Sequence, residues 1–274
     1  MSRYQLITAL SAVATLAMSC PTQAANPWAD QVVSYTQGTG PAPGFTVPGA
    51  ALGEPTRDSV AFGGFVISPF GGAADPSEVV SLGAGGELVV KFDEPVTDDP
   101  DNPFGIDLLV FGNSFLGLSS FNNDEFDLAT GPTFGEGGIV SVSADGINWE
   151  TITGVDADGR FPTNGYNDIT TPFPTAGSIP ADFTKPVDPN LDVTGLNTAG
   201  VIAGYDGSGG GAGIDLASVG LSEISYVRVF NPADSTTSPE IDGFADVRAV
   251  PEPNTIALLA VCLLSTRSRR RFAR

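Results

Sequence analysis

Glycine and proline interrupt this sequence at short intervals, which restricts the secondary structure that the chain can form. The 274 residues include 34 glycines and 22 prolines, and both residue types disfavour the interior of helices and central strands. Short runs rich in valine, isoleucine, leucine and phenylalanine lie between them, and long amphipathic helix patterns are missing. This pattern predicts an all-β fold of the β-sandwich type with long loops.

Six short runs are the expected strands of this sandwich. They are residues 87–92, 106–111, 139–143, 149–152, 224–230 and 241–250. Asp145 and Gly146 precede the fourth run and predict a tight hairpin turn, because glycine adopts the positive φ that such turns need. Residues 153–213 are rich in proline and lack a strong strand pattern, so we expect loops there, followed by a short helix near residues 216–219.

The first 24 residues have the pattern of an export signal. Arg3 is followed by an apolar stretch over residues 6–18, and the small residues around Ala24 suit a signal peptidase. We therefore expect a signal helix in residues 1–24 that is removed by cleavage after Ala24. The alternative, a lipid attached at Cys20, requires a lipobox that the three preceding residues match poorly.

The C-terminal segment contains three unlike parts in order. The first part is the motif Val250, Pro251, Glu252 and Pro253. An apolar run over residues 256–264 follows, and as a short helix it would span about 14 Å, roughly half of a bilayer core of about 30 Å. The third part is a basic cluster that contains Arg267, Arg269, Arg270 and Arg271. A permanent membrane anchor is therefore not expected, and the arginines place the C-terminus on the cytoplasmic side.

These three parts resemble the PEP-CTERM sorting signal of exported bacterial proteins. The resemblance covers residues 250–274 and implies processing by an exosortase-type membrane transpeptidase, often in bacteria that make extracellular polysaccharide. It also implies a protein of the cell envelope, cell surface or extracellular space that contacts the membrane through its C-terminal segment before processing. A plain C-terminal anchor is the alternative interpretation.

The body between these signals, residues 25–249, is acidic and lacks cysteine and histidine. It contains 31 acidic and six basic residues, a net charge of about −25. This charge excludes nucleic acid as a partner, because phosphate binding requires clustered lysine or arginine. Both cysteines lie in the expected signals and the chain has no histidine. Disulfides in the body, serine–histidine catalysis and typical zinc sites are therefore excluded.

Several short motifs of the body resemble those of bacterial cell-surface proteins related to discoidin-like, galactose-binding-type domains. They lie in residues 82–92, 105–113, 142–149, 213–217, 227–229 and 240–244. The resemblance spans roughly residues 75–250 and implies a jelly-roll-like β-sandwich. The expected architecture is one such domain, flanked by an N-terminal signal helix and a short C-terminal hydrophobic helix.

Calcium is the first ligand that the acidic loops indicate, because it takes hard oxygen ligands from carboxylates. One candidate cluster comprises Asp98, Asp99, Asp101 and Asn102. Asp156 and Asp158, before Gly159, resemble half of a calcium-binding loop. A second set would converge if the last strands pair, and it comprises Asp206, Asp215 and Asp242. No cluster has the full spacing of an EF-hand loop. Solvated acids and carboxylates that cap turns are the alternative interpretations.

Aromatic side chains would allow carbohydrate binding, which is common among jelly rolls. Tyr166 and Tyr205 lie in polar stretches and are the best candidates, and Trp28 and Phe173 are further ones. Trp149, just after the hairpin turn, is expected in the core.

The expected function follows from the sorting signal more than from the body. We expect an exported envelope or extracellular-matrix protein with a structural or adhesive role, which Ca²⁺ would stabilise, and no enzymatic activity. The first alternative is a module that binds exopolysaccharide. The second is a glycoside hydrolase or lyase that uses two carboxylates, although nothing in the sequence singles out one pair.

Overall fold

The computed structural model describes residues 26–118 and 129–247. The expected signal helix, the PEP-CTERM segment and the expected C-terminal helix lie outside these residues. In the described part of the chain, no helix is both long enough and apolar enough to cross a membrane.

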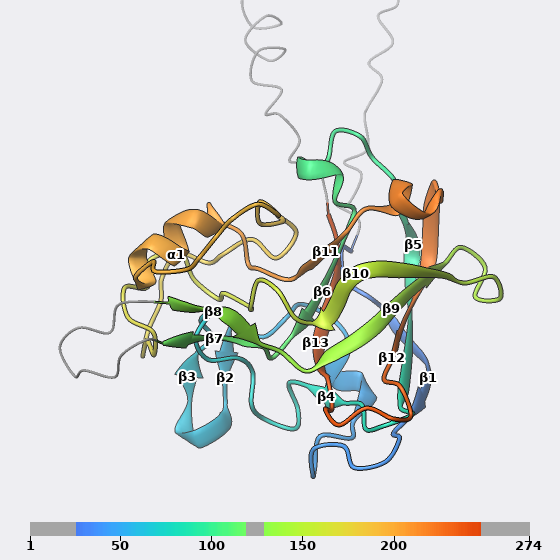
Figure 1. Ribbon diagram of the computed structural model, residues 1–274, viewed down its shortest axis with the longest axis horizontal. Coiled ribbons are helices and arrows are strands. Elements are labelled where there is room, and N and C mark those ends of the chain that lie inside the picture. The colour runs from blue at the N-terminus through green and yellow to red at the C-terminus, as the bar shows by residue number, and fades with distance from the viewer. Residues whose placement is uncertain (1–25, 119–128, 248–274) are drawn as a thin grey trace, which may run out of the picture.

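The first sheet is antiparallel and has five strands (Figure 1). In spatial order they are β1 (Gln31–Thr36), β5 (Glu87–Thr97), β12 (Glu223–Phe230), β9 (Gly137–Ser143) and β10 (Glu150–Asp158). The side chains of β12 that face the core are Ile224, Val227 and Val229. The alternation changes parity after Ile224, where the register of the pairing with β5 shifts between Ile224 and Tyr226.

The second sheet is also antiparallel and has four strands. In spatial order they are β11 (Ala212–Ile214), β6 (Leu108–Gly112), β13 (Glu240–Asp246) and β4 (Val80–Ser81). Every residue of β6 is buried. Leu108 and Val110 belong to the core between the sheets, whereas Leu109 and Phe111 pack with Phe183 on the outer face. β6 is therefore apolar throughout rather than alternating, because both of its faces are covered.

One hydrophobic core joins the two sheets. Leu88 and Val229 of the first sheet belong to the same buried cluster as Val110 and Phe244 of the second. Burial of each such side chain contributes about 1.5–3 kcal/mol, so packing between the sheets stabilises both. The structure confirms an all-β body that resembles a sandwich. The discoidin-like jelly-roll topology stays a prediction.

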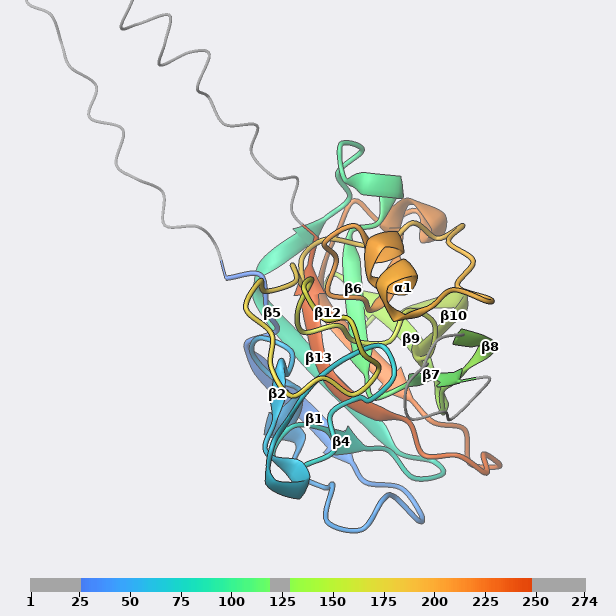
Figure 2. The same ribbon diagram turned by 90° about the vertical axis from the view of Figure 1, so that its left-hand side faces the viewer.

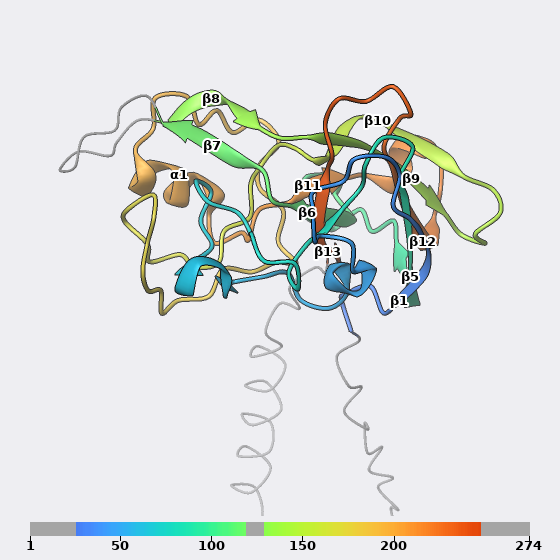
Figure 3. The same cartoon turned by 90° about the horizontal axis from the view of Figure 1, so that it is seen from below.

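Two short hairpins and one helix form a lateral group on one side of the sandwich (Figures 1 and 2). Its elements are β2 (Asp58–Ser59), β3 (Phe65–Val66), β7 (Phe115–Leu118), β8 (Ala129–Phe134) and α1 (Thr198–Tyr205). Figure 3 shows α1, β7 and β8 at one side of the molecule and β1, β5 and β12 at the other. The 3₁₀ helices of the described chain are η1 (Pro48–Ala51), η2 (Ala61–Gly63), η3 (Pro103–Gly105) and η4 (Leu216–Val219).

The structure differs from the sequence prediction in residues 153–213. β10 continues through the start of this region to Asp158, and α1 lies near its end. α1 begins after Asn197, whose side chain accepts a hydrogen bond from Gly200 N–H at 2.8 Å and so caps the helix. The expectation that residues 153–213 contain only loops is therefore wrong. The short helix expected near residues 216–219 is the 3₁₀ helix η4.

The two ends of the described body lie side by side. Trp28 pairs with Ala245 in an isolated antiparallel bridge. Asp246 N–H donates to Pro27 O at 2.7 Å. The segment after the expected signal and the segment before the sorting motif therefore leave the body at one place.

Candidate functional site

A cleft of about 930 Å³ lies between the lateral group and the ends of two sandwich strands. We call it the phenylalanine cleft, because six phenylalanines line it, four of them exposed: Phe62, Phe115, Phe134 and Phe173. Phe115 and Phe134 come from paired strands, and their rings stack with centroids 5.2 Å apart. All four rings are substantially exposed. Exposed apolar rings gathered in one concave place are typical of a binding site.

Phe62 is the most exposed of these rings. It lies in the loop between β2 and β3, and 95% of its surface is accessible. Its φ is 53°, a left-handed conformation that costs an ordinary residue about 1–2 kcal/mol. Packing within the chain does not explain a ring that is both exposed and held on a strained backbone. A ligand in the cleft would give this ring a partner.

Three carboxyl side chains also line the cleft, and two of them form a pair. The side chains of Glu136 and Glu240 lie close enough to influence each other's pKa. Burial, followed by the negative charges of Glu240 and Asp158, raises the pKa of Glu136 to about 7. Burial also raises the pKa of Glu240. Asn113 comes directly after β6, and its Nδ2 donates to Glu240 Oε2 at 2.7 Å.

Asp158, the third carboxyl, is fully buried beside this pair. Burial raises its pKa to about 7. Its Oδ1 accepts a hydrogen bond from Ser114 N–H at 2.8 Å, and a Cβ atom at Gly112 would overlap that oxygen. Glycine at position 112 therefore permits the close approach of β6 to Asp158. Within the described residues, Asp158 Oδ2 has no hydrogen-bond partner, and such a buried acceptor is costly.

The cleft combines apolar ring faces with polar carboxyl groups. Its ring faces suit the apolar face of a sugar, and its carboxyl oxygens can accept hydrogen bonds from hydroxyl groups. Asp158 is fully buried, so the half-buried Glu136 and Glu240 are the more accessible carboxyl groups.

The structure brings some of the predicted calcium ligands together. Carboxylate oxygens of Asp98, Asp107 and Asp215 lie within 4.8 Å of one another. Asp98 is exposed, and desolvation by its neighbours, followed by the charges of Asp107, Asp215 and Asp99, raises its pKa. Asp99 Oδ1 instead accepts a hydrogen bond from Asp101 N–H at 2.9 Å, and Asp101 is exposed.

Asp107 is the member of this acidic cluster that the sequence did not indicate. Its Oδ1 accepts hydrogen bonds from Asp99 N–H at 3.1 Å and Asn102 Nδ2 at 3.0 Å. Its Oδ2 accepts one from Leu216 N–H at 3.0 Å. Asp107 lies at the start of an apolar run, so sequence patterns assign it to a strand and give no sign of a ligand.

The second predicted calcium set does not form. Asp206, Asp215 and Asp242 do not come within 4.8 Å of one another. Asp206 ends α1 and forms an ion pair with Lys185 Nζ at 2.8 Å. Asp242 is buried in β13 and accepts hydrogen bonds from Thr56 N–H and Thr56 Oγ1. Both of these carboxylates have local structural roles, which corrects the expectation that they converge on Asp215.

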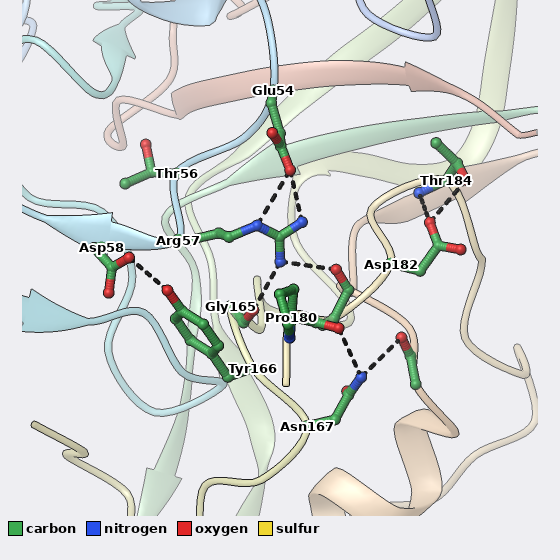
Figure 4. Close-up of polar contacts among 12 residues, drawn as sticks. Glu54, Thr56, Arg57, Asp58, Gly165, Tyr166, Asn167, Pro180, Asp182 and Thr184 are labelled. Carbon is green, nitrogen blue, oxygen red and sulfur yellow. Dashed lines mark hydrogen bonds and ion pairs between the residues drawn. The ribbon is translucent and has the colours of Figure 1, made fainter. Parts of the chain in front are cut away.

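The two best aromatic candidates from the sequence, Tyr166 and Tyr205, lie outside the cleft lining. Tyr166 is half-buried, and its hydroxyl group donates to Asp58 Oδ2 at 2.7 Å (Figure 4). Beside it, the Arg57 guanidinium donates to Gly165 O and contacts Glu54. The Tyr166 side chain therefore belongs to a network of hydrogen bonds that joins β2 to the loop around residue 165.

Tyr205 is not in a loop and is not available as a stacking surface. It lies at the end of α1, is 1% exposed, and donates to Pro162 O at 3.0 Å. Its prediction as a ligand residue is wrong, because the apolar ring packs inside the lateral group. Trp149 is half-buried, with the Arg228 guanidinium carbon 4.7 Å from its ring centroid, rather than in the core.

Sequence spacing does not reveal the phenylalanine cleft. Its carboxyl groups come from positions 136, 158 and 240, and its rings from four separate segments. Phe173 is the only cleft ring among the aromatic candidates named from the sequence. One sequence feature could have indicated this cleft. Phenylalanines lie in glycine- and proline-rich segments, such as residues 61–64 and 172–174, where packing in the core is not expected.

Comparison with protein families identifies one segment of the chain. Residues 249–271 match the PEP-CTERM protein-sorting motif. The match confirms the sorting motif and implies export, exosortase-type sorting and association with the cell envelope. Comparisons with curated proteins and with solved structures gave no match.

Proposed function

We propose that this exported protein has an adhesive role at the cell surface and binds exopolysaccharide in the phenylalanine cleft. The observation that carries the proposal is the set of four exposed rings around a cleft lined by carboxyl groups. Sugar rings have an apolar face and a polar edge, and binding sites meet them with aromatic faces and a few polar groups. The cleft has both.

The position of the cleft supports a role in adhesion. Glu240, at the start of β13, lines the cleft, whereas Asp246, at the end of the same strand, contacts Pro27 near the described termini. An extended strand of this length spans about 20 Å. The cleft therefore lies at the end of β13 that is farther from the sorting motif, on the part of the body that a tethered protein presents away from its attachment.

Carbohydrate binding can be tested with isolated exopolysaccharide and with oligosaccharides by calorimetry. Phe62→Ala is expected to weaken binding by at least about tenfold, because a central aromatic contact is lost. Phe104→Ala is the matched control: Phe104 is exposed, has a φ of 61°, and lies outside the cleft. Equal losses in the two variants, or no binding by the parent protein, would contradict the proposal.

The same assay separates binding from glycoside hydrolysis or lysis, the second alternative. Binding predicts that the bound polysaccharide is recovered intact. Release of shorter oligosaccharides that stops in an Asp158→Asn variant would instead assign catalysis to the cleft.

We also propose that Ca²⁺ stabilises the loops around Asp98, Asp107 and Asp215. Their oxygens suit a hard cation. Both oxygens of Asp107 and Oδ1 of Asp215 already accept hydrogen bonds from backbone N–H groups. Asp98 and Oδ2 of Asp215 are therefore the more available ligands. Asn102 supports the proposal, because its Oδ1 is buried next to Asp107 and has no hydrogen-bond partner among the described residues. Calcium usually takes six to eight oxygen ligands, so water molecules would complete this set.

We propose processing near the Pro251–Pro253 motif by an exosortase-type enzyme, the partner that the motif implies. Mass spectrometry of surface-exposed protein from a host with such an enzyme is expected to show a mature chain without Arg267–Arg271. Intact Arg274 in that material would contradict processing. The same measurement locates the N-terminal cleavage expected after Ala24.

A further inference from the structure

The charge of the phenylalanine cleft restricts which carbohydrate it can hold. Glu136, Asp158 and Glu240 line it, and its lining in the described chain includes no lysine or arginine. The ion pairs observed among the described residues all involve other acids. The cleft thus gathers three acidic groups without a protein cation in its lining to balance them.

Asp158 makes the lack of a positive partner more specific. Its side chain is fully buried, its Oδ2 has no hydrogen-bond partner among the described residues, and the groups that lower its pKa are backbone N–H groups of Ser114, Glu240 and Glu136 rather than a charged side chain. A buried carboxyl group of this kind is stabilised by a nearby positive charge or a hydrogen-bond donor. An ammonium group of a ligand in the cleft can supply both. It can donate hydrogen bonds to Glu136 and Glu240, and its positive charge acts on the nearby Asp158.

The rings favour the same kind of ligand. A cation within about 6 Å of an aromatic ring centroid is attracted by the negative face of the ring. Phe115 and Phe134 present neighbouring rings at the cleft, and Phe62 and Phe173 add two more. An ammonium group can therefore lie between ring faces and carboxyl groups, while the apolar face of its sugar ring covers the phenylalanines.

We infer that the phenylalanine cleft selects carbohydrate that carries protonated amino groups, such as a polymer of unacetylated hexosamine. The inference rests on the carbohydrate binding proposed above and adds the charge of the ligand. Polymers of uronic acids are excluded from the cleft by like-charge repulsion. N-acetylated polymers have the same backbone but lack the ammonium group that the carboxyl groups would recognise.

The test compares three oligomers of equal length at about pH 7, where the cleft carboxyl groups, with pKa values raised to about 7 in Glu136 and Asp158, are partly ionised and amino groups still carry charge. They are β-1,4-linked glucosamine, β-1,4-linked N-acetylglucosamine and galacturonic acid oligomers, measured by calorimetry. The glucosamine oligomer is expected to bind at least about tenfold more tightly than its acetylated counterpart. The galacturonic acid oligomer is expected to show no binding.

A matched pair of variants shows whether the cleft causes this preference. Glu240→Gln removes a cleft charge but keeps an oxygen that can accept the hydrogen bond from Asn113. Glu94→Gln changes the net charge equally at an exposed position outside the cleft. The preference for the glucosamine oligomer is expected to be lost in Glu240→Gln and kept in Glu94→Gln. Should Glu240→Gln fail to fold, added salt provides a second measurement, because screening reduces only the charge-dependent preference.

The outcomes separate this inference from the proposed function. Equal affinities for the glucosamine and acetylated oligomers would overturn the inference and leave carbohydrate binding intact. If Glu240→Gln still prefers the glucosamine oligomer, the preference comes from the acidic surface as a whole. That result would also overturn the inference about the cleft. Failure of every oligomer and of the exopolysaccharide to bind would overturn both.

Discussion

Replacement of Asp242 by asparagine tests the electrostatics of the buried carboxyl groups. Asp242 is 2% exposed in β13, and its oxygens accept hydrogen bonds from Thr56 N–H at 2.9 Å and Thr56 Oγ1 at 2.8 Å. Burial raises the pKa of Asp242 from 3.8 to about 7, and the hydrogen bonds from Thr56 offset only part of that increase. Asparagine keeps the shape and an acceptor oxygen, but it does not titrate.

The raised pKa fixes the sign of the effect. Between about pH 4 and pH 7, folded Asp242 holds a proton that the unfolded chain releases, so its contribution to stability is complete below about pH 4 and is lost as the pH rises through about 7. One such proton changes the free energy of unfolding by about 1.4 kcal/mol per pH unit. Over roughly three pH units the loss is on the order of 4 kcal/mol. Asp158 and Glu136, whose pKa values are raised to about 7, add to it.

Urea unfolding followed by tryptophan fluorescence at about pH 5, 6 and 7 measures this slope. Asp242→Asn is expected to reduce the fall in the free energy of unfolding by about 1.4 kcal/mol per pH unit, while Asp158 and Glu136 maintain the rest. Parallel pH profiles for the parent and the variant would refute the reasoning. Asp145→Asn is the control: hydrogen bonds from Asn148 and Ile147 lower the pKa of Asp145. Its stabilisation is therefore lost only at acid pH, and its removal leaves the slope between about pH 5 and 7 unchanged.

Two further predictions concern the cleft and the acidic cluster. Gly112→Ala is expected to lower the free energy of unfolding by about 1–3 kcal/mol, because the added Cβ overlaps Asp158. It is also expected to weaken carbohydrate binding. Gly49→Ala is the control and is expected to have neither effect, because the space around its Cβ position is open. Equal urea midpoints for the two variants would contradict this. Removal of calcium with a chelator is expected to lower the melting temperature by about 5–10 °C if the ion is at about 100 times its dissociation constant. Asp98→Asn with Asp215→Asn should abolish that response, and an unchanged melting temperature in the parent protein would refute calcium stabilisation.

Local sequence patterns predict the strands of the sandwich better than any other part of the fold. β5, β6 and β12 are found because their apolar runs lie between glycine, proline and acidic turns, and burial against the facing sheet requires those residues. α1 is not found, because its eight residues include two glycines and lack a clear polar face. Val201 and Tyr205 pack into the lateral group, so tertiary contacts stabilise this helix where local propensity does not.

The cleft is harder to predict for a related reason. Glu240 and Glu136 are separated by more than 100 residues. Glu136 directly precedes β9 of the first sheet and Glu240 begins β13 of the second, so only the packing of the two sheets brings them together. Likewise Asp98 and Asp215 are predicted as members of different sets, and the fold places them together beside Asp107. Composition identifies an acidic surface, but topology decides which acids become neighbours.

The place of β13 in the second sheet affects the order of events during export. β13 is the last described strand, yet it lies between β6 and β4, and it supplies Glu240 to the cleft. A chain that crosses the membrane from its N-terminus therefore cannot close this sheet until residue 246 has emerged, five positions before Pro251. Completion of the fold then coincides with arrival of the sorting motif at the membrane. A newly exported chain would therefore complete the phenylalanine cleft only at the moment when its sorting motif reaches the membrane.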